Sequence, residues 1–292
     1  MKRRAFLGSL GSVGAGLAAL AVRPVIRAAQ DTNAFDIVIV GAGSSGCVIA
    51  HRLSADPSVR VLVIEAGEGD GAAAMSDPGQ WVSLLGTSVD WNYRTEPATG
   101  LDGRTLQWPR GKTLGGSSAI NAMAYVRGHR ASYDAWARLA DPSWGYDQVL
   151  PIFRQLEDNS RGPSTYHGAG GALAVSDTTD PHAGHLAFLE AARALGYGAS
   201  PTWDFNGAQQ ENGAGFYQKN IHQGRRHSAA DAFLRPVQTR SNLTLWPRTT
   251  AQRLLIERGR VTGLDVVRDG RPLRVAVRRE VVLSAGVIES PK

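Results

Sequence analysis

Short apolar runs and a glycine-rich turn alternate near the start of the globular part of the chain. Residues 36–40 (DIVIV) are nearly all apolar and β-branched, which is typical of a buried parallel strand. The turn at residues 41–46 (GAGSSG) follows, and residues 47–56 (CVIAHRLSAD) then carry apolar side chains at helical spacing up to Pro57. Residues 59–65 (VRVLVIE) repeat the strand pattern. This order predicts a strand, a tight turn, a helix and a second strand.

Similar patterns recur towards the end of the chain. Residues 185–195 place leucines and alanine at amphipathic-helix spacing. Residues 260–277 alternate apolar and polar side chains around Asp269-Gly270, which predicts a β-hairpin with a tight turn. Residues 280–285 (EVVLSA) form another buried-strand candidate.

The middle of the chain is less regular. Residues 68–90 are rich in Gly, Ala and Ser and predict loops, and residues 91–116 are dense in Trp, Arg, Pro and Gly. Pro142 and Pro151 predict a helix boundary around residues 141–150.

The first 28 residues have the layout of an export signal. A basic start precedes an uncharged run from Ala5 to Val22, and Arg3-Arg4 followed by Phe6 and Leu7 resembles a twin-arginine signal. We therefore expect residues 1–28 to be a signal peptide that engages the twin-arginine export machinery and directs the protein to the periplasm. A retained membrane anchor is the alternative, because 18 uncharged residues just reach a spanning length.

Charge and cysteine content narrow the classes of function. The 292 residues carry a net charge of +6, but residues 1–28 hold five of the 32 cations and no acid. The remaining 27 cations balance 26 acids, so nucleic acid binding has no support in the body of the chain. The single cysteine, Cys47, excludes an internal disulfide or a multi-cysteine metal site.

The glycine turn has the spacing of a dinucleotide-binding motif. Gly41, Gly43 and Gly46 form GxGxxG between a predicted strand and helix, and Glu65 ends the next strand. In such a unit the glycines allow a tight turn, approach to a pyrophosphate and close helix packing, while the acid accepts from a ribose hydroxyl. Cys47, in the first turn of the helix, is expected to be a small buried packing residue.

Many colinear stretches resemble the glucose–methanol–choline (GMC) oxidoreductase family, most of all its choline dehydrogenase and alcohol dehydrogenase branch. The similarity covers residues 35–291, and the stretch at residues 111–134 is the family's first signature. The matching segments include DIVIVGAGSSGCVIAHRLS, VLVIEAG, DWNYRTEP, WPRGKTLGGSSAINAMAYVRGH, SWGYDQVLPIFRQLED, YHGAGGALAVS, GRRHSAADAFLRP and EVVLSAGVIESP.

The resemblance implies an α/β fold, a Rossmann-like FAD-binding domain with an interleaved substrate domain over residues 35–292, whose C-terminal part this chain lacks. It implies FAD, held non-covalently because Ile120 stands where some members carry a flavin-bonded histidine. The residues it places around FAD are Gly41, Gly43, Ser44, Ser45, Gly46, Glu65, Ala66, Thr113, Gly115, Gly116, Ser117, Asn121, Ala122, Met123, Ala124 and Ala251.

The implied reaction is oxidation of the CH–OH group of a small alcohol with hydride transfer to FAD. Quinone, cytochrome or oxygen remain as electron acceptors. The family's catalytic histidine lies in the C-terminal half, so we expect no catalytic residue within these 292 residues and no activity of this chain alone. The alternatives are a non-catalytic FAD-binding module that needs a complementing chain, and an NAD-dependent Rossmann enzyme, against which the signature at residues 111–134 argues.

Three other constellations suggest no further chemistry. His182 and His185 have the spacing of metal ligands on one helix face, but no Cys or carboxylate cluster accompanies them, so no metal is expected. Cys47 occupies the position where a serine-hydrolase elbow around Ser45 needs glycine. The arginines of residues 253–279 are interspersed with acids, which indicates a solvated strand face.

Overall fold

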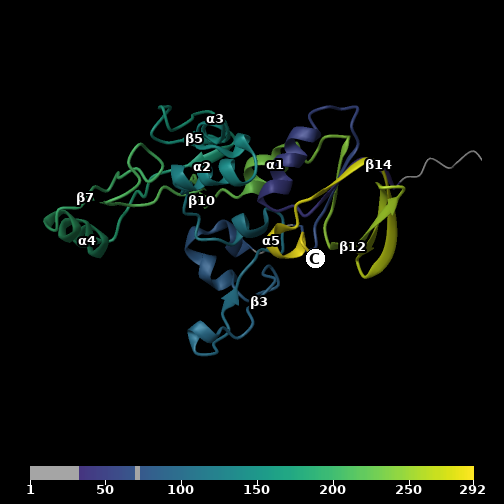
Figure 1. The fold of residues 1–292 in the computed structure, drawn as a ribbon, viewed down its shortest axis with the longest axis horizontal. Coiled ribbons are helices and arrows are strands. Elements are labelled where there is room, and N and C mark those ends of the chain that lie inside the picture. Colours follow the sequence, from purple (N-terminus) through teal and green to yellow (C-terminus); the bar gives the residue numbers. More distant parts are fainter. Residues whose placement is uncertain (1–32, 70–72) are drawn as a thin grey trace, which may run out of the picture. The chain divides into compact units, whose positions relative to one another are not determined.

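The computed structural model describes residues 33–69 and 73–292 (Figure 1). The predicted signal at residues 1–28 lies outside this part of the chain. The strands are β1 (Ala34–Val40), β2 (Val61–Ile64), β3 (Tyr93–Arg94), β4 (Gln107–Trp108), β5 (Glu157–Asn159), β6 (Leu173–Val175), β7 (Gly198–Ala199), β8 (Gly213–Ala214), β9 (Ile221–His222), β10 (Arg225–Arg226), β11 (Leu243–Trp246), β12 (Thr249–Glu257), β13 (Arg260–Arg268) and β14 (Arg271–Leu283). The α-helices are α1 (Ser44–Leu53), α2 (Arg130–Leu139), α3 (Tyr146–Leu156), α4 (Ala183–Ala194) and α5 (Gly286–Glu289).

A six-stranded sheet in the order β11-β2-β1-β14-β13-β12 organises the fold. Strands β11, β2, β1 and β14 pair in parallel, whereas β12, β13 and β14 pair antiparallel. Both faces of β1 and β2 are covered, because nearly every one of their residues is buried. The mixed α/β class expected from the sequence is confirmed, as are the strand–turn–helix–strand order and the helix predicted at residues 185–195.

Helix α1 differs from its predicted bounds. It begins at Ser44, inside the glycine turn, and not at Cys47. Gly43 is its N-cap and has an extended conformation, with φ −74° and ψ −166°. Because Gly43 itself is not helical, Ser44 is the first residue of the helix. It ends at Leu53, four residues before Pro57.

One long strand takes the place of two predicted ones. The hairpin at Asp269-Gly270 is confirmed, and both residues have positive φ (49° and 75°), as a two-residue type I′ turn requires. The second arm of the hairpin does not stop, however, but continues as β14 into the predicted strand at residues 280–285. The first half of β14 pairs antiparallel with β13, and its second half pairs parallel with β1.

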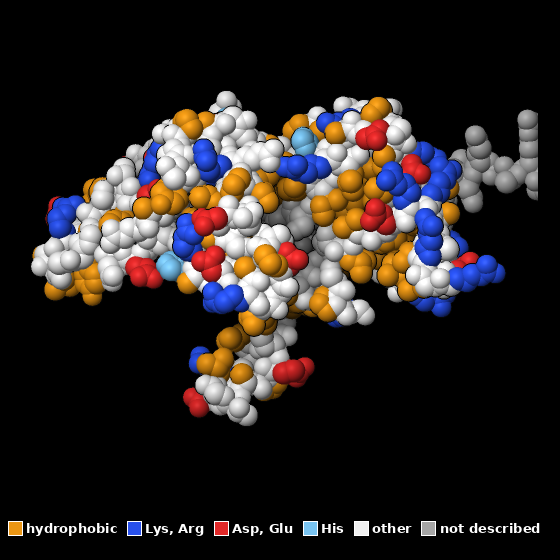
Figure 2. Space-filling view, turned by 45° about the horizontal axis from the view of Figure 1, so that its top comes forward, with side chains coloured by type: hydrophobic (Ala, Val, Ile, Leu, Met, Phe, Trp, Pro, Cys, Tyr) orange, Lys and Arg blue, Asp and Glu red, His pale blue; other side chains and the backbone are white. Residues whose placement is uncertain are grey.

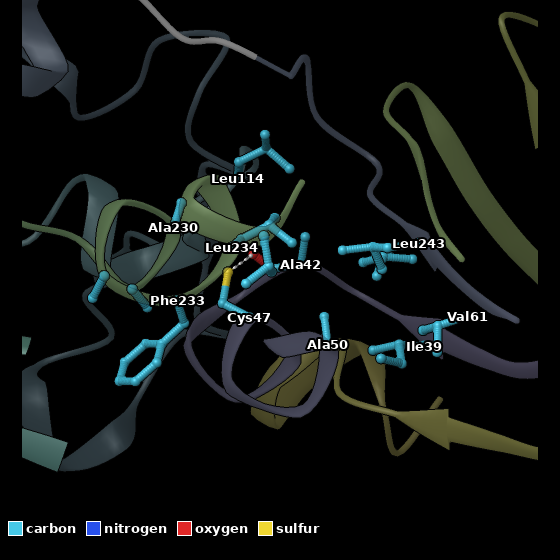
Figure 3. Packing of buried hydrophobic residues seen from close by; sticks show 14 of the residues in the cluster. Ile39, Ala42, Cys47, Ala50, Val61, Leu114, Ala230, Phe233, Leu234 and Leu243 are labelled. Atoms are coloured by element: carbon cyan, nitrogen blue, oxygen red, sulfur yellow. Dashed lines mark hydrogen bonds between the residues drawn. The ribbon is translucent and has the colours of Figure 1, made fainter. Parts of the chain in front are cut away.

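The main core lies between this sheet, α1 and a π-helical turn, η6 (Ala230–Leu234). Figure 3 shows Cys47 among Ala42, Leu114, Phe233 and Leu234, with its thiol directed at the Ala42 carbonyl 3.2 Å away. The side chain is fully buried, and burial raises the pKa of the thiol to about 12. Cys47 is therefore the packing residue that the sequence predicts.

Helices α2 and α3 correct one expectation. Pro142 does lie between them, in a 3₁₀ turn, but Pro151 lies inside α3 and does not end it. Proline removes one N–H and clashes with the preceding turn. Tyr146 and Val149 are buried before the proline, and Phe153 and Leu156 pack on neighbouring segments after it, so tertiary packing holds the helix on both sides.

The antiparallel end of the sheet carries an arginine-rich surface. Figure 2 shows Lys and Arg side chains gathered over the part that contains the β12–β14 strands. Asp265 accepts from both Arg253 and Arg274, and all three are solvent-accessible, which agrees with the predicted solvated strand face. Among the described residues no helix is both long and apolar enough to cross a membrane.

Candidate functional site

A cavity of about 1010 Å³ lies where the parallel strands end. Its walls include the residues that follow β1, β2 and β14, which come together because parallel strands present their carboxyl ends at one edge of the sheet. This volume is at the upper end of the range for small-molecule sites. The lining residues include Val40, Gly41, Gly43, Ser44, Ser45, Ile64, Glu65, Ala66, Trp91, Tyr93, Arg110, Gly116, Ser117, Thr249, Thr250, Ala251, Ser284, Ala285 and Glu289.

The three glycines of the turn have different spatial requirements. Gly41 has φ +96°, and a Cβ there would lie 2.7 Å from the carbonyl oxygen of Ser284. A Cβ on Gly46 would lie 1.9 Å from the carbonyl oxygen of Gly41. A Cβ on Gly43 would have only the Ser284 oxygen within reach, at 4.0 Å, because this position faces the cavity. Gly41 and Gly46 are needed by the fold, whereas Gly43 leaves space for a ligand.

The start of α1 offers polar groups to the cavity. Ser44 and Ser45 are exposed and line it, and the first-turn N–H groups of a helix have no intrahelical acceptor. The helix dipole adds positive potential at this end, and the first turn contains no acid. This wall therefore suits an anionic group.

A second glycine-rich segment, at residues 115–116, packs against the glycine turn at residues 41–46. A Cβ on Gly116 would lie 2.8 Å from the Cα of Gly43, so the two backbones are in direct contact. The N–H of Gly115 donates to the Ala42 carbonyl at 2.8 Å. The segment is strained for any other residue type, since Gly115 and Gly116 have φ of +86° and +53°.

Glu65 connects the turn to the end of β2. Its Oε2 accepts from the N–H of Ala42 and its Oε1 from the N–H of Gly67, both at 2.9 Å. Burial raises the pKa of Glu65, and the N–H groups of Gly67 and Ala42 act in the opposite direction. The carboxylate thus holds the turn in shape while it lines the cavity.

The residues selected from the sequence fall into two groups. Nine line the cavity: Gly41, Gly43, Ser44, Ser45, Glu65, Ala66, Gly116, Ser117 and Ala251. The other seven do not line it: Gly46, Thr113, Gly115, Asn121, Ala122, Met123 and Ala124.

Sequence reasoning did not single out the aromatic wall. Trp91 and Tyr93 stack with ring centroids 5.7 Å apart and planes within 7°. The Nζ of Lys112 lies 4.8 Å above Trp91, and the Nζ of Lys292 lies 5.6 Å from the Tyr93 ring. Tyr93 also donates to Glu289, and its burial and this carboxylate raise the pKa of its hydroxyl. The only signal for this wall was the density of Trp, Arg, Pro and Gly in residues 91–116.

No histidine lines the cavity within the described residues, which contain all seven histidines of the chain. His182 caps α4 by accepting from the N–H of Gly184, with the ring of His185 6.0 Å away. In the part of the chain that the structure describes, no group of three His, Cys, Asp or Glu side chains is arranged to hold a metal ion.

A charged network is buried away from the cavity. His167 lies between Asp204, 2.9 Å from Nε2, and Glu157, 3.1 Å from Nδ1. Hydrogen bonds to these carboxylates raise the pKa of His167 to about 9. Arg127 donates to the same Glu157 oxygen at 2.8 Å. The network joins four chain segments and has no contact with the cavity.

The parallel strands, the glycine turn at a helix start and the carboxylate at the end of β2 define an α/β dinucleotide-binding protein. The profile of the family described as GMC oxidoreductase matches residues 35–292. The chain belongs to the GMC oxidoreductase family, and the resemblance seen in its sequence is confirmed.

Curated relatives and solved structures agree with this assignment. The chain is 42% identical to human mitochondrial choline dehydrogenase, over 99% of this chain and 48% of that protein. It is 42% identical to an alcohol dehydrogenase [acceptor] of Pseudomonas putida, over 88% of this chain and 47% of that protein. The crystal structure of pyridoxine 4-oxidase from Mesorbium loti matches with a TM-score of 0.83 and 40% identity, over 88% of this chain and 50% of that one. The chain thus spans about half the length of the relatives it matches.

Proposed function

We propose that this chain binds FAD non-covalently in the cavity and forms the cofactor-binding half of an oxidoreductase that acts on the CH–OH group of a small alcohol. The observation that carries the proposal is the direct contact of Gly43 and Gly116 beside the start of α1, at the carboxyl ends of the parallel strands. Membership of the GMC family and the likeness to an FAD-dependent oxidoreductase from Chaetomium thermophilum support FAD as the cofactor.

The residues present fit an extended dinucleotide. The free N–H groups of Ser44 and Ser45 suit a pyrophosphate, and Gly43 leaves room for it. Glu65 keeps lone pairs that a ribose hydroxyl can donate to, since each of its oxygens accepts one backbone N–H. Gly116 and Ser117 line the continuation of the cavity. The buried Ile120 offers no atom for a covalent bond to flavin.

Bound FAD supplies the acceptor for the hydride that leaves the alcohol carbon. The chain's own residues would bind and orient the cofactor, which the start of α1 and the Gly116–Ser117 segment would hold. A base for the hydroxyl proton has no candidate among the histidines described, because none lines the cavity. We therefore propose that the catalytic base lies in a polypeptide corresponding to the other half of the relatives. The complete enzyme determines whether quinone, cytochrome or oxygen accepts the electrons.

The test is an FAD titration of the purified chain, followed by absorbance near ~450 nm and by retention of flavin on gel filtration. Gly43→Val is the informative variant, because a Cβ at this position has only the Ser284 oxygen near it, at 4.0 Å, and the side chain would enter the cavity. Gly100→Val is the matched control, because Gly100 is exposed and a Cβ there meets nothing within 4 Å.

We expect the wild type and Gly100→Val to retain FAD, and Gly43→Val to lose it while its melting temperature without FAD stays unchanged. Denaturation should release the flavin. Retention of FAD by Gly43→Val at wild-type stoichiometry would overturn the placement of the pyrophosphate. A folded wild-type chain that binds NAD and no FAD would overturn the proposed function.

We further propose that residues 1–28 direct export through the twin-arginine machinery to the periplasm. Support comes from the sequence alone, in which Arg3-Arg4 precede an uncharged run. A fusion of residues 1–32 to a folded reporter should appear in the periplasm, and Arg3→Lys with Arg4→Lys should keep it inside the cell. Export of the double variant at an unchanged rate would contradict the proposal.

A further inference from the structure

Arg226, in β10, is a buried arginine that joins three distant segments. Its Nε donates to the Met75 carbonyl at 2.8 Å. Its Nη1 donates to the Ser118 carbonyl at 3.2 Å, to the Asn121 carbonyl at 2.6 Å and to the Asn121 Oδ1 at 2.9 Å. The residue is 5% exposed and does not line the cavity. The guanidinium therefore holds the segment from Ser118 to Asn121 from behind.

Among the described residues, no carboxylate is in contact with Arg226. All its acceptors are neutral, and its Nη2 is buried without a hydrogen-bond partner among the described residues. Asp231, the acid that acts on it electrostatically, is bound to Ser228 and Arg235. Burial lowers the pKa of Arg226, as expected for a cation held without a counter-charge.

The segment that Arg226 holds directly follows one wall of the cavity and has a demanding backbone. Gly116 and Ser117 line the cavity directly before Ser118. Met123 is buried and has φ +60°, a left-handed conformation that is costly for a residue with a side chain. Hydrogen bonds from surrounding segments, including those of Arg226, must hold this path. A neutral substitute of similar length would lose both the bonds and the charge.

We infer that Arg226 is a positioning residue that fixes the Ser118–Asn121 segment next to the Gly116–Ser117 wall and also places an uncompensated positive charge there, which favours the reduced over the oxidised state of the cofactor. The inference rests on the proposed FAD site. Hydride from an alcohol brings two electrons and one proton, so the bound FAD gains one negative charge as the alcohol carbon is oxidised. A nearby buried cation stabilises that added charge, because the interior screens it poorly.

Asn121→Asp separates the two roles of Arg226. The carboxylate is the same shape as the amide, keeps the acceptor for Nη1 and for the Met123 N–H, and supplies the absent counter-charge. Arg226→Gln removes charge and most hydrogen bonds, and Arg226→Lys keeps the charge but not the fork of donors. Arg225→Gln is the matched control, since Arg225 is the exposed neighbour in the same strand.

The experiment measures thermal stability without FAD and the midpoint potential of bound FAD in a reductive titration. We expect Asn121→Asp to melt no lower than the wild type, yet to lower the preference for reduced FAD on the order of tenfold, which for a two-electron couple is about 30 mV. Arg226→Gln should show the same loss of preference with a lower melting temperature. Arg226→Lys should destabilise but keep the preference, and Arg225→Gln should change neither.

A purely structural role predicts a different pattern. Both Arg226 variants would then be destabilised, while the ratio of affinities for reduced and oxidised FAD stayed within about twofold of wild type in every variant. That result, or a melting temperature of Asn121→Asp well below that of the wild type, would overturn the inference. If the wild-type chain bound no FAD, the proposed function would fail, and the stability of Asn121→Asp would still decide whether the charge of Arg226 is uncompensated.

Discussion

The N–H of Ala42 donates to the Oε2 of Glu65 across 23 residues of sequence, at 2.9 Å. This bond ties the glycine turn to the end of β2, and the second oxygen of Glu65 ties the same carboxylate to Gly67. The acid at the end of the second strand thus serves the folded turn whether or not a ribose is present. Its structural role can be separated from ligand binding by experiment.

Glu65→Gln should lower the free energy of unfolding by about 1–3 kcal/mol in the absence of cofactor. An amide has one acceptor oxygen, so either the Ala42 or the Gly67 N–H would face an NH₂ group inside the protein. Urea denaturation of the two proteins measures the difference. Glu68→Gln is the control, because Glu68 is exposed, and equal stability of Glu65→Gln and Glu68→Gln would refute this role.

Gly46→Ala should prevent correct folding of the turn, with a loss of at least about 3 kcal/mol. The new methyl group would lie 1.9 Å from the Gly41 carbonyl oxygen, which is backbone and cannot rotate away. Circular dichroism and thermal melting would report the loss. Gly43→Ala should melt like the wild type, and a stable Gly46→Ala protein would mean that α1 can shift away from β1.

Cys47 should react with a thiol reagent only when the protein opens. Its thiol is fully buried, bonded to Ala42, and burial raises its pKa to about 12, so the reactive thiolate is scarce near neutral pH. The labelling rate should rise steeply with denaturant and fall when FAD is added, since a ligand that binds the native state suppresses opening. Rapid labelling in native buffer, independent of FAD, would contradict the observed packing.

His167 should make stability depend on pH between about 6.5 and 9. Its pKa rises from 6.5 to about 9 on folding, so its contribution is complete below the unfolded pKa and is lost as the pH rises through the folded one. The contribution is on the order of 1–3 kcal/mol at its maximum. His167→Gln should flatten the stability–pH curve in this window, measured by urea denaturation at each pH.

The carboxylates around His167 determine how stability changes with pH on the acidic side. Burial, the largest single effect, raises the pKa values of Glu157 and Asp204, but hydrogen bonds from His167 and from backbone N–H groups, together with the nearby cations, outweigh it and lower both. Their contribution is therefore present above the ordinary carboxyl range and is lost as the pH falls through the folded values. A His167→Gln protein with the same slope as the wild type between pH 6.5 and 9 would disprove the assignment.

Sequence patterns predicted the elements whose backbone conformation depends mainly on their own residues. The apolar run at residues 36–40, the glycine turn and Asp269-Gly270 each determine their own backbone, and the structure follows them. The continuation of β14 was not predictable from its own residues, because the strand is joined by pairing with β1, more than 230 residues away. Pro151 remained in a helix because packing of Tyr146 and Val149 overrode a local preference.

The candidate site likewise contains residues that the sequence indicated and residues that only the folded structure reveals. Glycine spacing indicated the turn, whereas the family resemblance indicated residues near Gly116 and Ala251. Trp91 and Tyr93 reach the cavity through tertiary contacts such as the hydrogen bond from Tyr93 to Glu289, 196 residues away, and neither residue type nor spacing reveals that. The bonds of Arg226 to Ser118 and Asn121 cross more than 100 residues and were invisible for the same reason.

The pairing of β14 with β1 also sets an order of events during synthesis. Val40 lies opposite Leu283, so the central pair of the sheet cannot close until almost all of these 292 residues have been made. Until then the buried edge of β1 is open, and such an edge invites pairing with other chains. Slow long-range closure of this kind leaves the nascent chain exposed to aggregation, and it delays the formation of the cavity until translation has passed the last strand.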